Sequence, residues 1–329
     1  MSSIKNFTFI ALTYNHGRFI LEHLESIKYI IQTFGRKIDV DIIVADDASK
    51  DNTVELSNSW LDKNACLFRK VTVLSDGINR GTCKNLALAL NIFATDYCKI
   101  TGGDDVFSCE NLFAEVEKID GNDILSGFPL NLIGTTLSPT QFDLFNLIAT
   151  NIIYQHSPYE DRLKKINFFN SPNIVYSVSA LKNKEVLSFV ERYSVTEDYP
   201  LQIKMADLYR PLKFIQIEKV LVYYRRTAGS TYLTKNSVFS ADKLAIFDYL
   251  VQSEIPFVGR LLLINRAFCF KLKNRYLKMI LNINVYLYGF SILLNILNIV
   301  KRFRAFNPQL MKHQAHYSLI ASKAKSHSV

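Results

Sequence analysis

The chain has 329 residues and 49% of them are hydrophobic, which is enough for a large core and excludes disorder of the whole chain. Its net charge of +9 is unevenly distributed, because the last acidic residue is Glu254, whereas residues 260–329 contain 12 Lys and Arg. Residues 1–259 hold the other 27 basic residues and all 30 acidic ones. A mildly acidic body is therefore followed by a basic, acid-free tail, and we expect the two parts to have different roles.

The N-terminus and the cysteines indicate a cytoplasmic protein. The sequence runs directly into a predicted strand without a charged and then apolar leader, so we expect no signal peptide. The five cysteines are odd in number and show no C-x-x-C spacing. We expect them to be buried free thiols in a reducing compartment.

Strands and helices alternate in the first hundred residues. Short apolar runs predict strands at 7–12, 39–45, 71–75 and 97–101. Helical spacing of apolar residues between them predicts helices at 19–34, 52–62 and 83–93. This alternation predicts an α/β fold with a mainly parallel, Rossmann-type sheet flanked by helices. Right-handed crossovers place the carboxyl ends of these strands on one edge of the sheet.

The pattern is less regular after residue 122. We expect strands at 123–134 and 173–181, one or two strands at 213–226, and an irregular insertion at 139–165. Thr196 is the expected N-cap of a helix that begins in the segment TEDYPL. From about residue 238 the chain is predicted to be helical.

Three acidic pairs are the main chemical signal. They are Asp46-Asp47 after the second strand, Asp104-Asp105 after the fourth strand and two glycines, and Glu197-Asp198 at the start of a later helix. Ligands of open α/β sheets bind beyond the carboxyl ends of the strands. Carboxylates combined with substrate phosphates are a common way to hold Mg²⁺ or Mn²⁺. The pairs therefore predict an enzyme site for a metal and a phosphorylated ligand, in which Asp47 accepts hydrogen bonds from a nucleobase or ribose.

Several motifs in this order resemble a family 2 glycosyltransferase with the GT-A fold over residues 4–232. They are Thr13-Tyr14-Asn15-His16, Asp46-Asp47-Ala48-Ser49-Lys50-Asp51, Asn79-x-Gly81 with Lys84-Asn85, Gly103-Asp104-Asp105, Thr196-Glu197-Asp198-Tyr199 and Tyr224-Arg225-Arg226 with Gly229-Ser230. The resemblance implies that a sugar moves with inversion from a nucleotide-diphospho-sugar, with UDP-sugar as the favoured donor, to an acceptor hydroxyl.

The resemblance also implies a role for each site residue. Asp198 would be the general base and Asp105 the ligand of Mn²⁺ or Mg²⁺. Residues that would bind the nucleotide-sugar are Thr13, Tyr14, Asn15, Asp47, Lys84, Asp104, Glu197 and Arg226. The acceptor would be a glycan or a lipid-linked glycan of a bacterial surface polysaccharide.

Two positions depart from the family pattern. Gly103 stands where many relatives have a further aspartate of the metal motif, and Thr227 stands where many have a histidine after the Tyr-Arg motif. Arg225 or Arg226 would then grip the phosphates, because a guanidinium binds phosphate bidentately. A strand-end arginine that faces water is the alternative.

Two other functions remain open at this point. A nucleotidyltransferase shares the α/β core and the Asp-bound metal, but its Gly-rich Arg-Lys loop is poorly matched by residues 13–18. A membrane-associated binding protein with a relict sugar-nucleotide site is the non-enzyme alternative.

The tail has the composition of a membrane-surface helix. Residues 279–300 carry no charge, and Asn284, Ser291, Asn295 and Asn298 fall on one helical face. Basic residues precede and follow this segment. We expect an amphipathic helix in an anionic membrane interface, at the inner face of the cell membrane. A transmembrane span and packing on the body are alternatives, nucleic-acid binding is not expected, and His313, His316 and His327 show no metal-ligand spacing.

These features predict two domains. Residues 1–235 would be the catalytic domain, with a nucleotide-binding half at 1–127 and an acceptor half at 128–235. Residues 236–329 would be a helical, basic and apolar extension.

Overall fold

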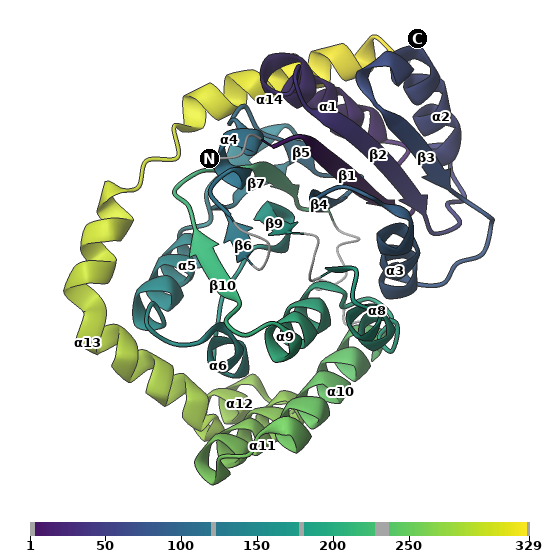
Figure 1. Cartoon of the computed structure of the whole chain (residues 1–329). Coiled ribbons are helices and arrows are strands. Elements are labelled where there is room, and N and C mark those ends of the chain that lie inside the picture. Colours follow the sequence, from purple (N-terminus) through teal and green to yellow (C-terminus); the bar gives the residue numbers. More distant parts are fainter. Residues whose placement is uncertain (1–3, 120–122, 178–180, 228–236, 328–329) are drawn as a thin grey trace.

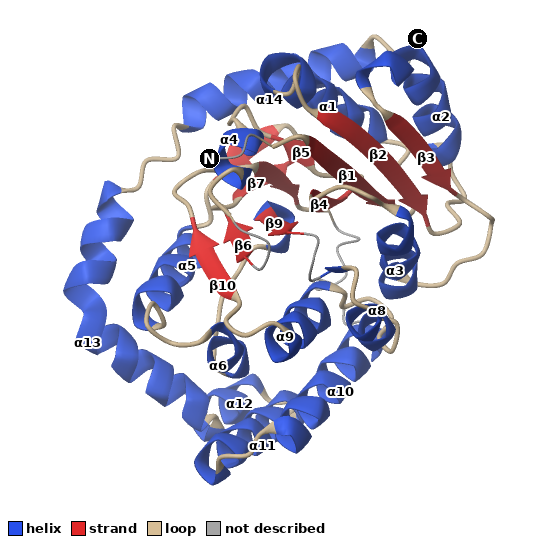
Figure 2. Cartoon of the chain, in the orientation of Figure 1, coloured by secondary structure: helices blue, strands red, loops and turns tan. Residues whose placement is uncertain are grey.

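The computed structural model describes residues 4–119, 123–177, 181–227 and 237–327. The Gly229-Ser230 motif therefore lies outside the described residues. Two β-sheets form the centre of the molecule, and helices cover them on all sides (Figures 1 and 2).

The first hundred residues fold as the alternation predicts. The elements are β1 (Asn6–Thr13), α1 (Ile20–Phe34), β2 (Asp39–Asp46), α2 (Thr53–Asn64), β3 (Lys70–Leu74), α3 (Thr82–Ile92) and β4 (Tyr97–Gly102). In β1 and β2 seven of the eight residues are buried, because helices cover both faces of the sheet. The prediction of a mainly parallel sheet is confirmed for these strands.

The large sheet has the strand order β10-β6-β9-β4-β1-β2-β3. Its other strands are β6 (Asp123–Ser126), β9 (Ile174–Ser177) and β10 (Lys213–Gln216). β9 runs antiparallel to both of its neighbours, β4 and β6, whereas the other described pairs are parallel.

The second sheet has the order β5-β11-β7-β8. Its strands are β5 (Val106–Phe107), β7 (Leu130–Ile133), β8 (Thr136–Ser138) and β11 (Val222–Arg225). The prediction of one strand at 123–134 is wrong, since β6 and β7 belong to different sheets. Gly127 and Phe128 separate them by donating their N–H groups to Asn173 O and Lys219 O. The 213–226 segment divides in the same way, so that β10 pairs with β6 and β11 pairs with β7.

The segment 139–165 is helical, and the prediction of an irregular insertion is wrong. It forms α5 (Gln141–Ile153) and α6 (Tyr159–Lys164). Leu144, Leu147 and Ile148 lie on one face of α5 and are buried. That spacing is the helical signal, and the polar residues between them obscured it.

The helix with the third acidic pair starts one residue later than predicted. This helix is α9 (Asp198–Leu208). The other helical elements of the body are η1 (Ala65–Leu67), α4 (Leu112–Val116), η2 (Ser171–Asn173) and α8 (Lys184–Val190). Glu197 occupies the N-cap position of α9, so the expected N-cap Thr196 is wrong. The Thr196 N–H instead donates to the Asp242 carboxylate at 3.1 Å.

The predicted helical tail is confirmed, and it wraps around the body. Its helices are α10 (Ser237–Ser253), α11 (Phe257–Lys271), α12 (Arg275–Leu281), α13 (Ile283–Ala305) and α14 (Leu310–Lys325). In Figure 1 they run from α8 past α6 and α5 and back across α1. α14 contributes the buried Tyr317 and Ile320 to a core cluster with β7 and β11 residues, and its His316 ring lies 4.4 Å from the Tyr29 ring of α1.

The cysteines are all free, and the prediction of burial holds for three of them. Cys83, Cys98 and Cys269 are buried, whereas Cys66 is exposed and Cys109 is partly exposed. Burial raises the pKa of the Cys98 thiol to about 12, so this thiol stays protonated and unreactive.

Candidate active site

The carboxyl ends of three strands place the predicted motifs side by side. In the sheet register Thr13 pairs with Asp46, and Leu12 pairs with Gly102. A cavity of about 970 Å³ opens at this edge. Its lining includes eight of the ten predicted site residues: Thr13, Tyr14, Asn15, Asp47, Asp104, Asp105, Glu197 and Asp198.

The two other predicted site residues lie outside this lining. Lys84 is exposed on α3. Arg226 donates through Nε to Asn131 Oδ1 at 3.0 Å and through Nη2 to Asp143 Oδ2 at 3.2 Å. Its guanidinium is therefore bound to the protein beside the cavity.

The loop after β1 is fixed by the loop after β2. Asn15 has a left-handed backbone with φ of 56°, which asparagine tolerates better than most residues. Its N–H donates to Ser49 Oγ at 2.8 Å, and its Oδ1 accepts from the Lys50 N–H at 2.7 Å. These bonds hold Tyr14 at the cavity with 48% of its surface exposed, where its ring is available to a ligand.

Asp47 shapes the wall of the cavity. Its Oδ1 accepts from the Arg80 N–H at 2.6 Å, and its Oδ2 accepts from the Gly81 N–H at 3.0 Å. Gly81 has φ of 84°, and a Cβ there would lie 2.7 Å from Ser194 O, so only glycine fits. Each carboxylate oxygen keeps a further lone pair for a ligand.

The Asp104-Asp105 pair has the chemistry of a cation site. Asp105 is buried, and its Oδ1 accepts from the Arg225 N–H at 3.0 Å. Burial, and then the neighbouring charge of Asp104, raise the pKa of Asp105 well above its usual value. Two carboxylates so close together in a poorly solvated place are stabilised by a bound cation. A Cβ at Gly103 would lie 2.6 Å from Thr13 Cγ2 and 3.1 Å from Ile20 Cδ1, which favours glycine directly before the pair.

Arg225 supports this pair from behind. Its Nε donates to Asp104 O at 2.6 Å, and its Nη2 pairs with Glu22 Oε2 at 2.5 Å. The guanidinium also stacks over the Phe19 ring at 4.5 Å. Because Arg225 is buried, the water-facing alternative is wrong for it, and its Nε and Nη2 donate to protein acceptors.

Glu197 and Asp198 enter the cavity from the start of α9. The Asp198 Oδ1 accepts from the Tyr199 N–H at 2.7 Å, which fixes the carboxylate. Burial, and then the charge of Asp198, raise the pKa of Glu197 to about 8. A carboxyl group with a perturbed pKa in a cavity, such as that of Glu197, is typical of functional sites.

Several lining residues were missed by sequence reasoning. Among them are His16, which was named only as part of the first motif, and Phe239 and Lys243 of α10. The side-chain Nδ1 of His16 is buried without a hydrogen-bond partner among the described residues. For α10 no local signal existed, because it reaches the site only through the tertiary fold.

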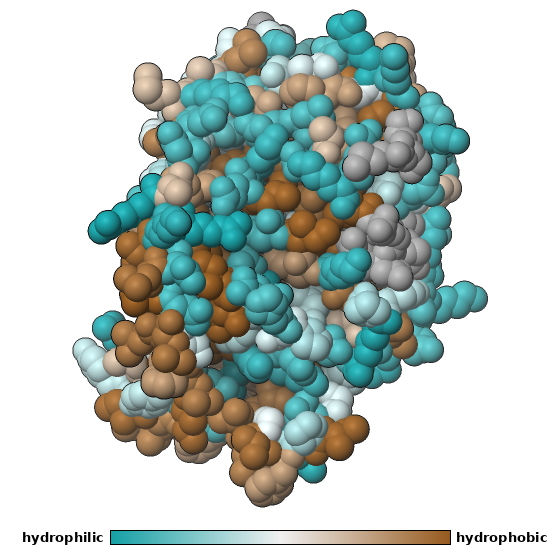
Figure 3. Space-filling model, turned by 60° about the vertical axis from the view of Figure 1, so that its left-hand side comes forward, coloured by the Kyte–Doolittle hydropathy of each residue, from teal (hydrophilic) through white to brown (hydrophobic). Residues whose placement is uncertain are grey.

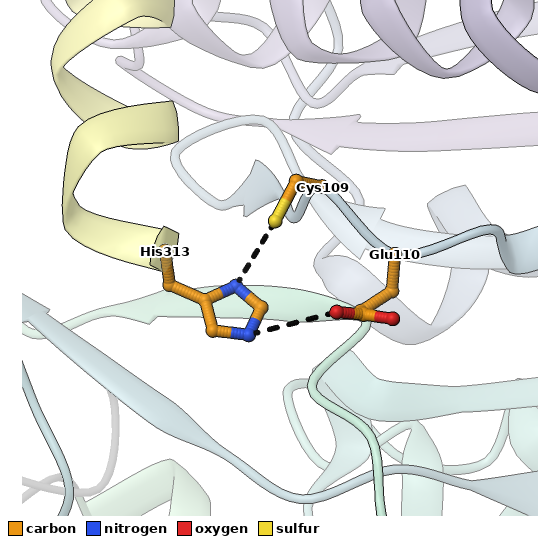
Figure 4. A group of neighbouring side chains, drawn as sticks. All are labelled: Cys109, Glu110 and His313. Atoms are coloured by element: carbon orange, nitrogen blue, oxygen red, sulfur yellow. Dashed lines mark hydrogen bonds and ion pairs between the residues drawn. The ribbon is translucent and has the colours of Figure 1, made fainter. Parts of the chain in front are cut away.

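A second group of polar side chains lies outside the cavity. Figure 4 shows Cys109, Glu110 and His313, with ligand atoms within 4.8 Å of one another. The Glu110 carboxylate already pairs with Lys312 at 2.7 Å and with Lys219 at 3.4 Å. His313 Nδ1 also lies 2.9 Å from the Tyr223 hydroxyl. We interpret this group as a polar contact that holds α14 on the body.

The comparisons with known proteins define the class. The sequence model of the family described as glycosyl transferase family 2 matches residues 8–183, more than half of the chain. The chain therefore belongs to glycosyl transferase family 2, and this membership makes it a transferase enzyme.

One individual relative matches only part of the chain. Abequosyltransferase RfbV of Salmonella typhimurium is 30% identical over 105 residues, which are 32% of this chain and 30% of that protein. The match thus spans less than a third of the relative's length.

Solved structures share the fold. TarS of S. aureus (residues 1–349, in complex with UDP-GlcNAc) is 18% identical with a TM-score of 0.57, and covers 98% of this chain and 92% of that one. The mannosyltransferase PcManGT of Pyrobaculum calidifontis, in complex with GDP-Man and Mn²⁺, is 15% identical with a TM-score of 0.54, and covers 99% and 88%. These likenesses confirm the GT-A-type α/β fold with its helical C-terminal region.

Proposed function

We propose that this protein is a metal-dependent, inverting glycosyltransferase that uses a nucleotide-diphospho-sugar, with UDP-sugar as the favoured donor. The observation that carries the proposal is the convergence of Asp104, Asp105, Glu197 and Asp198 on one cavity at the carboxyl edge of the sheet. The donors in the complexes of the fold relatives, UDP-GlcNAc and GDP-Man, support the substrate class.

In this proposal Asp198 is the general base. It accepts the proton of the acceptor hydroxyl while the hydroxyl oxygen attacks the anomeric carbon. The bond between the anomeric carbon and the diphosphate oxygen breaks in the same step, so the nucleoside diphosphate leaves and the configuration inverts. Asp198 suits this task because its carboxylate is held by the Tyr199 N–H at the rim of the cavity.

Asp104 and Asp105 would hold Mn²⁺ or Mg²⁺. When bound, the cation would neutralise negative charge on the leaving diphosphate. The residues present fit such a group, because Asp105 is buried beside a second carboxylate and its pKa is raised. Asp104 would in addition contact the ribose, and the loop of Thr13, Tyr14 and Asn15 would hold the base.

We propose that the acceptor is a glycan or a lipid-linked glycan, at the cytoplasmic face of a membrane. The abequosyltransferase similarity supports a sugar-transfer role of this kind. The exposed apolar surface of the tail supports the membrane location, and Figure 3 shows apolar side chains gathered over the lower part of that face. Exposed members of this surface are Phe257, Val258, Leu261, Ile264, Phe268, Tyr276, Leu277, Met279, Ile280, Leu281, Ile283, Tyr286, Leu287, Phe290, Leu293, Leu294 and Leu297.

α13 has its polarity reversed relative to a helix in water. Its Asn284 is buried and donates to Leu262 O at 3.0 Å, and its Tyr288 hydroxyl donates to Asn146 Oδ1 at 2.9 Å. Ser291 and Asn295 of the predicted polar face are half-buried, and Asn298 is exposed. The leucines of α13 point outward instead, which favours contact with lipid.

An in-plane position is favoured over a transmembrane span. α13 has 23 residues and is apolar enough to cross a membrane, and only 11% of its most apolar window is buried. However, α13 packs along α5 through Tyr288, and its Phe303 ring lies 5.7 Å from the Phe145 ring. A helix anchored sideways on the body enters the interface with its outer face only. Basic residues before α13 and at its end, such as Lys273, Arg275 and Arg304, suit anionic headgroups.

The test of the proposed function is a panel of nucleotide-sugars. With Mn²⁺, the purified protein should hydrolyse one of the UDP-sugars or transfer its sugar to an acceptor. EDTA should abolish this turnover. A bound donor should also raise the Tm, because it binds only the folded state. Binding without any turnover, with every acceptor extract tried, would support the non-catalytic alternative. Release of pyrophosphate from a nucleoside triphosphate and a sugar phosphate would support the nucleotidyltransferase.

A further inference from the structure

The cavity has many carboxylates and few cations. Its lining contains Asp47, Asp104, Asp105, Glu197 and Asp198, and the described lining residues include only two Lys or Arg side chains, Arg225 and Lys243. A diphosphate adds more negative charge to this place. A cation from the protein would offset this charge in addition to a metal.

Arg225 does not provide this cation. Its Nε and Nη2 donate to Asp104 O and Glu22 Oε2, and its flat face covers the Phe19 ring. Moving it toward a ligand would break its ion pair with the half-buried Glu22. Arg225 is therefore a positioning residue for the Asp104-Asp105 loop.

Lys243 is the cation with donors to spare. Its ammonium lies 4.6 Å from the Tyr199 ring centroid and 5.5 Å from the Phe239 ring centroid. It forms no hydrogen bond or ion pair with the part of the chain that the structure describes, although the charges of Asp198 and Glu197 act on it. An ammonium group carries three donors, so this side chain is ready for an anionic ligand.

The backbone around Lys243 is tied to the active-site loop. The neighbouring Asp242 accepts the N–H groups of Ser194, Val195 and Thr196 at 2.8–3.2 Å. This contact places the first turns of α10 directly behind the Glu197-Asp198 pair. The buried Thr196 Oγ1, which has no partner among the described residues, lines the same wall.

We propose that Lys243 is a donor-binding residue whose ammonium group contacts a phosphate oxygen of the nucleoside diphosphate. It takes the part that the sequence reasoning gave to Arg225 or Arg226. This inference rests on the proposed function, since it assumes a nucleoside-diphosphate ligand.

The test compares diphosphate and nucleoside binding without and with metal. Affinities of UDP and GDP, and of uridine and guanosine, are measured by titration calorimetry for the wild type, Lys243→Met, Lys243→Arg and the control Lys63→Met. Lys63 is exposed on α2, away from the cavity. Methionine keeps the length of the side chain and removes its charge.

For the nucleotide that the wild type binds, Lys243→Met should weaken diphosphate affinity about 10-fold to 100-fold, as expected for a lost charge-assisted hydrogen bond. The loss should be present in EDTA, nucleoside affinity should not change, and Lys243→Arg should keep most of the affinity. Equal diphosphate affinity in Lys243→Met and wild type would overturn the inference. The inference would also be overturned if Lys243→Met kept its diphosphate affinity but showed a lower kcat and a shifted pH profile of activity. Lys243 would then act on Asp198 and not on the diphosphate. A wild type that binds neither nucleotide would contradict the proposed function itself.

Discussion

Asp198 is the residue on which the proposed chemistry depends. Replacement by asparagine keeps the size of the side chain and its hydrogen bond to the Tyr199 N–H. A general base contributes about 10²–10⁴ in rate, so Asp198→Asn should lower kcat by about that factor while donor affinity stays within about twofold. Transfer assays and calorimetry on the same preparations measure both quantities.

The matched control is Asp248→Asn, because Asp248 is exposed on α10. It should retain full activity. An Asp198→Asn enzyme with wild-type kcat would show that another group accepts the proton.

At the residue scale, the sequence predicted acids better than bases. Aspartates that directly follow buried strands have their positions fixed by the sheet, so Asp47, Asp104 and Asp105 reach the cavity as expected. The basic side chains are longer and less constrained, and their partners are set by tertiary contacts. Lys84 and Arg226 therefore do not line the cavity, and Lys243 was not predicted.

At the scale of elements, α10 connects the tail to the active site through Asp242. Its carboxylate is buried and accepts three successive N–H groups of the loop before Glu197. Asp242→Asn removes the charge and replaces one acceptor oxygen by a donor. We expect a loss of about 1–3 kcal/mol in the free energy of unfolding, and a fall in kcat because the Glu197-Asp198 pair loses its support.

Urea unfolding and transfer assays measure these two losses. Asp248→Asn serves again as the control, since it changes the same type of residue on the same helix. If Asp242→Asn retains both stability and activity, the loop is held by other contacts.

α14 gives the protein a dependence of stability on pH. Burial lowers the pKa of His316 to about 4, against the opposing effect of its contact with Phe107 O, and the charges of His313, Lys323 and Lys312 lower it further. Burial also lowers the pKa of His23, on α1, to about 4. The folded-state pKa is thus below the unfolded value of about 6.5, so the unfolded state binds more protons in between. Stability should be fully present above pH 6.5 and should be lost as the pH falls toward 4.

Urea titrations at pH 7.5, 6.0 and 5.0 test this dependence. In His316→Phe the free energy of unfolding should fall less steeply with decreasing pH, because one protonatable group fewer differs between the folded and unfolded states. His156 is exposed, and His156→Asn should follow the wild type. Equal slopes for all three proteins would mean that His316 is protonated in the folded state.

Local sequence patterns predicted the alternating strands and helices of the first hundred residues. They failed where the chain passes from one sheet to the other. The βαβ alternation up to β4 is explicit in the apolar spacing. By contrast, β6 and β7 pair with different strands that lie far away in the sequence, and Gly127 and Phe128 between them donate to distant carbonyl groups.

For the whole molecule, the tail wraps around the body and exposes the apolar surface that we propose faces a membrane. We expect the protein to float with vesicles that contain anionic lipid, and to float less with neutral vesicles or at high salt. The double variant Leu293→Asn, Leu297→Asn should reduce vesicle binding at least about 10-fold, because each side chain loses about 1.5–3 kcal/mol of apolar transfer free energy.

The control for flotation is Leu88→Asn, on the exposed side of α3 away from the tail. Binding that is unaffected by the double variant would place the membrane contact elsewhere. Release by detergent alone, at any salt concentration, would favour a spanning helix.

The division into residues 1–235 and 236–329 stays a prediction. It rests on composition, which separates the acidic body from the basic tail. The contacts of Asp242 with residues 194–196, and of α14 with α1, tie the two parts closely. Similarly, the boundary near 127 falls between β6 and β7, where the chain changes sheets.

The return of α14 to α1 has a consequence for biosynthesis. Helix α1 is synthesised long before Tyr317 and Ile320, which complete the adjoining core cluster. Until then part of that apolar surface has no cover. Nascent chains must therefore be protected from aggregation until α14 has left the ribosome, and this core cluster can be completed only then.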